Sequence, residues 1–188
     1  SLHDALPISE KTAESALFNE NLAALNANDA AGAAALVKEA AGSAQLREHI
    51  LFEQAHYAAK RMNPQAPELL ASFVALATDP ALKTQARLDQ AEVALNLNPP
   101  DLETVQAILP PLEKEQLTPE QTMQLARLNI LEAESRQEWP SAIQACRQAI
   151  ALDSEGKQAD MLYLKLGELL YKNGDFHEAQ LVLQPFPS

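Results

Sequence analysis

The sequence feature that most constrains the fold is a helical pattern that recurs along the whole chain. Stretches with apolar residues at helical spacing alternate with short breaks made of Asn, Asp, Gly and Pro, which are turn and helix-capping residues. Long helices are expected to begin near Glu10, Ser43, Pro80, Thr118 and Gly156. A turn is expected after each of them, near Asn28, Asn63, Asn98, Glu138 and Gly174. Because both series recur at roughly 35 to 40 residues, the sequence predicts an array of helical hairpins.

Composition favours the same fold class. Hydrophobic residues make up 47% of the 188 residues and aromatic residues only 5%. Ala and Leu supply most of the apolar content, and both are strong helix formers. We therefore predict an all-α fold over residues 9–188, an α-solenoid of about five antiparallel helical hairpins.

The charge and cysteine content exclude several classes of protein. The net charge of −12 disfavours binding to nucleic acid or to an anionic membrane, since both need clustered Lys and Arg, and it favours a basic or apolar partner. The single cysteine, Cys146, forms no internal disulfide and no cysteine-based zinc site. The longest apolar stretch, about nine residues from Leu69 to Ala77 and broken only by Ser72, is shorter than the roughly 20 residues of a membrane-spanning helix.

The first eight residues, Ser1 to Ile8, raise a separate point. Their sequence, SLHDALPI, resembles the translation of a common sequencing-adapter oligonucleotide, so we leave it out of the fold prediction as one would a fusion scar. We expect the natural chain to extend past both printed ends, with a further helix packing on Leu183 and Phe186, because terminal repeats normally carry a polar capping helix. The compartment therefore stays open, with the bacterial cell envelope favoured.

The stretch from Tyr163 to Phe186, YLKLGELLYKNGDFHEAQLVLQPF, resembles a tetratricopeptide repeat. The family pattern is W-x2-L-G-x2-Y, then A-x3-F, then P, over about 34 residues. The positions that carry the resemblance are Tyr163, Leu166, Gly167, Leu170, Gly174, Phe176, Ala179 and Leu183. Gly167 and Ala179 are expected where the two helices cross closely, and Gly174 where a tight turn needs left-handed backbone. Leu170, Phe176 and Leu183 are expected to fill the gap between the helices.

The preceding unit matches in its second helix, where Trp139, Ala142, Cys146 and Ala149 fall at the expected spacing. Its first helix has Ile130 where the family has Gly, and the earlier units keep only the period. The resemblance is thus clearest over Met123 to Phe186. A different helical-hairpin solenoid of similar period is the alternative.

The resemblance implies a non-catalytic scaffold that binds a protein or peptide on a concave face. By the same resemblance, that face presents Gln124, Arg127, Leu131, Glu134, Met161, Leu164, Glu168 and Tyr171. The basic clamp by which some family members hold a C-terminal carboxylate is not expected, because its positions hold Gln124, Leu131, Glu134 and Leu164. The mixture of apolar and charged residues suits a peptide or a helix. The alternative is an accessory repeat segment of a larger protein, such as an enzyme or an envelope assembly or secretion component.

The residues that suggest chemistry have simpler interpretations. Glu53-x-x-His56 matches one half of a helical di-iron motif, and His49 lies nearby, but no second such motif follows. Cys146 lies in an Ala- and Ile-rich stretch and is expected to be a small buried apolar residue. Trp139 is expected to pack rather than to bind a ligand. We therefore predict no enzyme activity, no metal and no cofactor.

Overall fold

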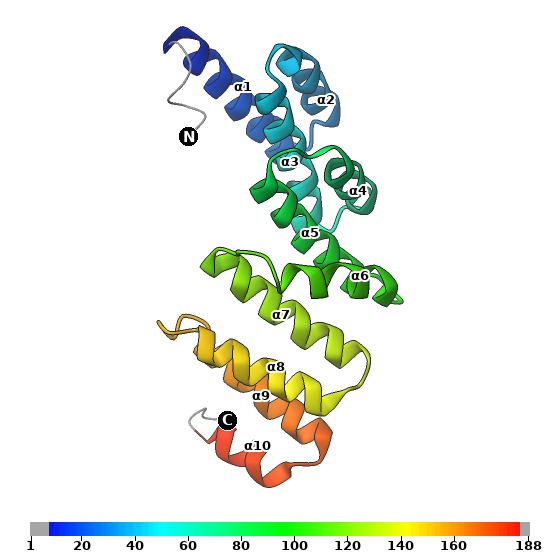
Figure 1. The fold of residues 1–188 in the computed structure, drawn as a ribbon, viewed down its shortest axis with the longest axis vertical. Coiled ribbons are helices and arrows are strands. Elements are labelled where there is room, and N and C mark those ends of the chain that lie inside the picture. Colours follow the sequence, from blue (N-terminus) through cyan, green and yellow to red (C-terminus); the bar gives the residue numbers. More distant parts are fainter. Residues whose placement is uncertain (1–7, 185–188) are drawn as a thin grey trace. The chain divides into compact units, whose positions relative to one another are not determined.

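The structure is a computed structural model that describes residues 8–184, and its regular structure in that range is entirely helical (Figure 1). The prediction of an all-α fold is confirmed. The α-helices are α1 (Ile8–Asn26), α2 (Ala30–Glu39), α3 (Ala44–Lys60), α4 (Ala66–Leu76), α5 (Pro80–Leu95), α6 (Leu102–Leu112), α7 (Pro119–Ser135), α8 (Trp139–Leu152), α9 (Ala159–Asn173) and α10 (Phe176–Leu183). A short 3-10 turn, Ala40–Gly42, follows α2. The chain divides into two compact units at Gln90 and Ala91, inside α5.

Within each unit, helices that follow one another in the chain pack together (Figure 1). In the N-terminal unit α1 packs on α2, α3 packs on α4, and both α1 and α2 contact α3. In the C-terminal unit α6 contacts α7, and α7, α8, α9 and α10 pack in sequence. Most packing partners are therefore close in the sequence, as they are in an array of helical hairpins.

Four of the turns in the described range share one backbone geometry. Each has a residue with positive φ after its first helix: Asn28 (57°), Met62 (52°), Gln137 (59°) and Gly174 (90°). The N–H of that residue donates to the carbonyl three residues earlier, at 2.8–3.1 Å. The N–H of the next residue donates to the carbonyl five residues earlier, at 2.8–2.9 Å. This is the Schellman motif, which satisfies the last carbonyls of a helix and reverses the chain.

Side-chain caps fix where several helices begin. Asp29 accepts from the N–H of Gly32, and Ser43 from that of Leu46. Thr118 and Gln121 form a reciprocal capping box at the start of α7. Asp101 caps α6, and the Thr104 hydroxyl also donates to its carboxylate. Each such cap stabilises its helix by about 1 kcal/mol.

The core of the C-terminal unit is built from α7 to α10. Leu162, Leu166, Leu169, Leu170 and Ala179 are buried there, together with the second-helix residues Ala142, Cys146 and Ala149. Gly167 of α9 lies directly against Leu183 of α10, because a Cβ at this position would lie 2.5–2.8 Å from the side-chain carbons of Leu183. The small residue is thus required by a close helix crossing.

Phe176 does not fill the gap between helices, and that prediction is wrong. Its side chain is 60% exposed, and its ring meets the edge of Tyr171 at 5.1 Å between centroids. Trp139, at the same place in the preceding hairpin, is half-buried and packs against the core of the C-terminal unit. The Lys172 Nζ of the next hairpin lies 5.4 Å from the centroid of its ring. Tyr163 is also partly outside the core, at 39% exposed.

Pro110 and Pro111 do not end α6, which continues to Leu112. A proline removes a backbone donor and leaves the carbonyl four residues earlier without its helical partner. Those carbonyls belong to Gln106 and Ala107, and all four residues lie on the exposed side of the helix. The two carbonyls that lose their helical partners therefore belong to the exposed side of the helix, and not to its buried side.

Replacing Gly174 by alanine tests the left-handed turn. We expect Gly174→Ala to lower the free energy of unfolding by about 1 kcal/mol, because a Cβ disfavours positive φ. Chemical denaturation followed by circular dichroism measures the change. Gly42→Ala is the matched control, since a Cβ there meets nothing within 4 Å and the φ of Gly42 is not positive. Equal effects at the two sites would contradict this account of the turn.

Candidate functional site

The predicted binding residues of α9 lie on one face of that helix. Met161, Leu164, Glu168 and Tyr171 are spaced by three, four and three residues, which places them along one side. Met161 and Leu164 are each 49% exposed and Tyr171 is 66% exposed. The Glu168 side chain is 48% exposed. The structure therefore brings these four together as one exposed stripe with three apolar members.

The predicted residues of α7 are less accessible. Leu131 is 37% exposed, whereas Gln124 and Arg127 are half-buried. The Gln124 amide nitrogen donates to a carboxylate oxygen of Glu92 on α5 at 2.9 Å. The Glu134 side chain is 15% exposed. Sequence reasoning assigned these positions to binding, but Gln124 and Glu134 are engaged in contacts between helices.

An ion-pair network joins α7 to α9. Lys165 lies 3.2 Å from Glu134 and 3.1 Å from Glu168, and Lys172 lies 3.2 Å from Glu134 and 2.7 Å from Glu168. The pKa of Glu168 is lowered by the hydrogen bond from Lys172, which has the largest effect, and by the hydrogen bond from Lys165. Burial has a smaller effect that raises this pKa. Sequence reasoning missed both lysines. The pairing of Glu168 with Lys172 was visible as an i,i+4 spacing, but the pairing with Glu134 depends on how two hairpins align.

Polar side-chain contacts between consecutive hairpins recur at nearly constant sequence separation. Gln54 donates to Asn21 across 33 residues, and Gln124 to Glu92 across 32. The Arg147–Glu178 pair spans 31 residues, as does Lys165–Glu134. Each contact therefore joins a residue of one hairpin to a residue at a corresponding position in the next hairpin.

His56 belongs to the same series, 33 residues before its partner Asp89. Its Nδ1 lies 2.5 Å from a carboxylate oxygen of Asp89, whose side chain is 1% exposed. The Gln85 amide donates to the other carboxylate oxygen at 3.1 Å, and the His56 ring stacks on Phe52 at 5.4 Å. The hydrogen bond to Asp89 raises the pKa of His56, burial opposes this, and the Asp89 charge adds to it.

The metal interpretation of His56 finds no support in the described residues. Among them, no group of three or more His, Cys, Asp and Glu side chains is arranged to hold a metal ion. His56 instead joins α3 to α5 through Asp89. Glu53 acts on His56 only through its charge, which raises the pKa of the imidazole.

Cys146 is fully buried, as the sequence suggested. Its thiol donates to the backbone carbonyl of Leu162 at 3.3 Å. Burial raises the pKa of the Cys146 thiol to about 11. Because the thiolate is the nucleophilic form, this cysteine is a packing residue.

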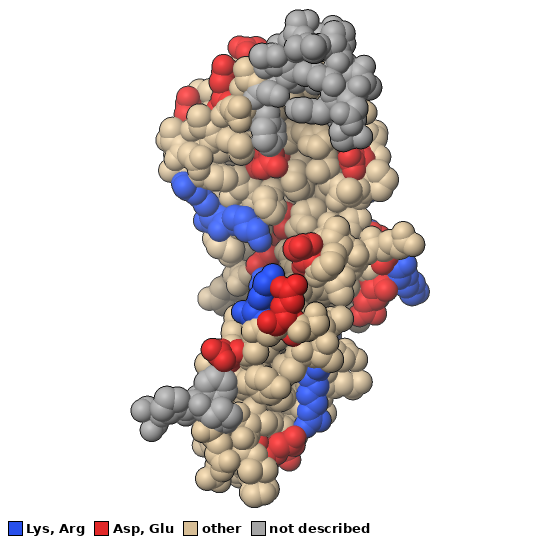
Figure 2. Space-filling model, turned by 90° about the vertical axis from the view of Figure 1, so that its left-hand side faces the viewer, with Lys and Arg blue, Asp and Glu red and all other residues tan. Residues whose placement is uncertain are grey.

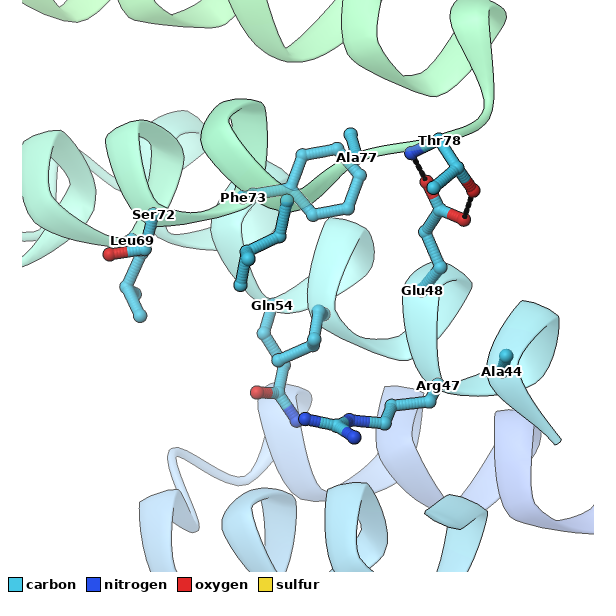
Figure 3. Close-up of a pocket in the computed structure, with 11 residues that line it drawn as sticks. Ala44, Arg47, Glu48, Gln54, Leu69, Ser72, Phe73, Ala77 and Thr78 are labelled. Carbon is cyan, nitrogen blue, oxygen red and sulfur yellow. Dashed lines mark hydrogen bonds between the residues drawn. The ribbon is translucent and has the colours of Figure 1, made fainter. Parts of the chain in front are cut away.

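Two adjoining hollows in the N-terminal unit were not predicted. The first, of about 330 Å³, lies between α3 and α4 (Figure 3). The second, of about 500 Å³, lies between the α1–α2 turn and the facing parts of α3 and α4. Gln54 and Leu69 line both. No motif in the sequence indicates them, because their walls depend on how the side chains of α1 to α4 pack together.

The surface charge fits the acidic composition. On the face drawn in Figure 2, the Lys and Arg side chains lie as small separate groups among Asp, Glu and uncharged residues. Within the described part of the chain, no helix is both long and apolar enough to cross a membrane. Comparisons of the chain with protein-family models, with curated proteins and with solved structures found no match.

The His56–Asp89 pair predicts a pH-dependent stability. A histidine whose pKa is raised on folding stabilises the protein below the unfolded pKa of about 6.5, and this contribution is lost as the pH rises through the higher folded value. We expect the difference in unfolding free energy between the wild type and His56→Gln to be largest near pH 5.5 and to shrink by about pH 8. Urea denaturation over this range measures it. A difference that grows as the pH rises would contradict the assignment.

Proposed function

We propose that the chain is a tetratricopeptide-like helical-repeat scaffold that binds a segment of another protein. Two observations support the repeat. The same Schellman turn closes four hairpins, and polar contacts between hairpins recur at separations of 31–33 residues. Arrays of this kind are stabilised by neighbour contacts and bind partners along their surfaces.

The exposed stripe on α9 is the observation that carries the proposed binding function. Met161, Leu164 and Tyr171 expose apolar surface on a helix whose opposite side is buried in the core. Leu131 of α7 adds a fourth exposed apolar side chain. A cluster of accessible apolar side chains on a rigid element is typical of a surface that binds a partner.

The charges beside the stripe favour a peptide or helix of mixed character. Glu134, Lys165, Glu168 and Lys172 neutralise one another locally, so the surface there carries no strong net charge of its own. The ion pairs also hold α9 against α7, which reduces the ordering that binding would require. An amphipathic segment that places apolar side chains on Leu164 and Tyr171 fits this surface.

Selection from a displayed library of random peptides, with the intact chain as bait, tests the proposal. We expect one class of selected clones to lose at least about tenfold in affinity for Leu164→Ser, since anchor residues at an interface each contribute more than about 1.4 kcal/mol. Leu181→Ser is the matched control, because Leu181 on α10 is 50% exposed, almost the same as Leu164. Fluorescence anisotropy with the labelled peptides measures the affinities.

The two variants also define the result that would contradict the proposal. Both residues are exposed, so both variants are expected to fold, and circular dichroism verifies this. If no clone distinguishes Leu164→Ser from Leu181→Ser, the α9 stripe is not the binding surface.

A further inference from the structure

The two hollows of the N-terminal unit lie along α3 and share Gln54 and Leu69 in their walls, and together they are called the groove. Arg47, Leu51, Gln54, Ala58 and Arg61 line it, and their spacing of four, three, four and three residues places them on a single face of the helix. From Arg47 to Arg61 this face is about 21 Å long, at 1.5 Å per residue. A groove of this length suits a peptide better than a small molecule, which would occupy one hollow alone.

The walls of the groove are mainly apolar. Between α3 and α4 the wall residues are Leu69, Phe73, Leu76 and Ala77. Leu69 is 38% exposed and Leu76 is 73% exposed. At the other hollow Ala30, Ala33 and Ala34 of α2 add a wall of small residues. The groove therefore admits bulky apolar side chains.

Most polar groups in the groove already have partners. The Glu48 carboxylate accepts from the N–H and hydroxyl of Thr78, at 2.5 and 2.7 Å (Figure 3). It also accepts from the N–H of Asp79 at 2.8 Å. Burial tends to raise the pKa of Glu48, but the hydrogen bonds from Asp79 and Thr78, with the charge of His49, outweigh it and lower that pKa. The Gln54 amide nitrogen donates to Asn21 and to the carbonyl of Ala33.

Arg47 is the exception. Its side chain extends along the hollow on the side of Gln54, and among the described residues no carboxylate lies within ion-pair distance of it (Figure 3). Its nearest acidic neighbour in the chain, Glu48, is directed to Thr78 and Asp79 instead. An arginine at the rim of an apolar hollow is suited to a carboxylate, which it binds with two parallel hydrogen bonds.

We propose that this groove binds a segment of a partner protein that carries one Asp or Glu beside bulky aliphatic side chains. The aliphatic side chains fill the hollow between Leu69 and Leu76, and the carboxylate pairs with Arg47. A single carboxylate is specified because the chain carries a net charge of −12, which repels a strongly acidic partner. This surface is separate from the α9 stripe and does not depend on it.

The same selection of random peptides on the intact chain tests the groove with different variants. We expect a class of clones that carry an acidic residue next to aliphatic ones and that lose at least about tenfold in affinity for Arg47→Glu and for Leu69→Ser. These clones are expected to bind Leu164→Ser as well as they bind the wild type. Lys38→Glu is the matched charge reversal, because Lys38 is exposed on α2 and lines neither hollow.

A charge exchange distinguishes a direct contact from a general electrostatic effect. Replacing the acidic residue of a selected peptide by Lys is expected to weaken its binding to the wild type and to restore binding to Arg47→Glu. The absence of such a class of clones, or clones that bind Arg47→Glu and Leu69→Ser as tightly as the wild type, would overturn the proposal. That result would leave the proposal for the α9 stripe standing, because the peptides that bind the stripe are identified by their loss of affinity for Leu164→Ser.

Discussion

The left-handed turn after the first helix of a hairpin is the constraint on which the rest of the structure depends. At Asn28, Met62, Gln137 and Gly174 the same pair of backbone hydrogen bonds ends the helix and sends the chain back along it. Once the turn is placed, the residues of the two helices that face each other are determined, because side chains on a helix repeat every 3.6 residues. The close approach of Gly167 and Leu183 is one result.

Contacts between hairpins follow from the same regularity. Hairpins of similar length bring equivalent positions of consecutive first helices into register, and polar side chains at those positions then meet across 31–33 residues. The contacts differ in chemistry, from the amide pair of Gln54 and Asn21 to the imidazole–carboxylate pair of His56 and Asp89. Because these side chains already hold hairpins together, we propose that a partner contacts the exposed residues between them. The α9 stripe and the α3 groove are such places.

The helices and turns could be predicted because their signals are local. Caps such as Ser43 and Thr118, and turn residues such as Gly174, act within a few positions of themselves in the chain. Met62 and Gln137 carry no such signal, yet both adopt positive φ with the same two backbone hydrogen bonds as the other turns. Other features depend on how hairpins align. They are the burial of Asn21, the ion pair of Glu134 with Lys165 and the exposure of the Phe176 side chain. A single sequence does not reveal that alignment.

Native-state hydrogen exchange of the turn amides tests most directly the claim that one turn geometry builds the hairpins. The informative amides are those of Asp29, Asn63, Glu138 and Asp175, each of which donates to the carbonyl five residues earlier. The account predicts that the exchange rate of each turn amide lies within about tenfold of the rates of the last amides in the helix before that turn. Both sets of amides lose their hydrogen bonds in the same local opening. Exchange of these four amides at the rate of an unstructured chain, with the flanking helices still protected, would contradict it.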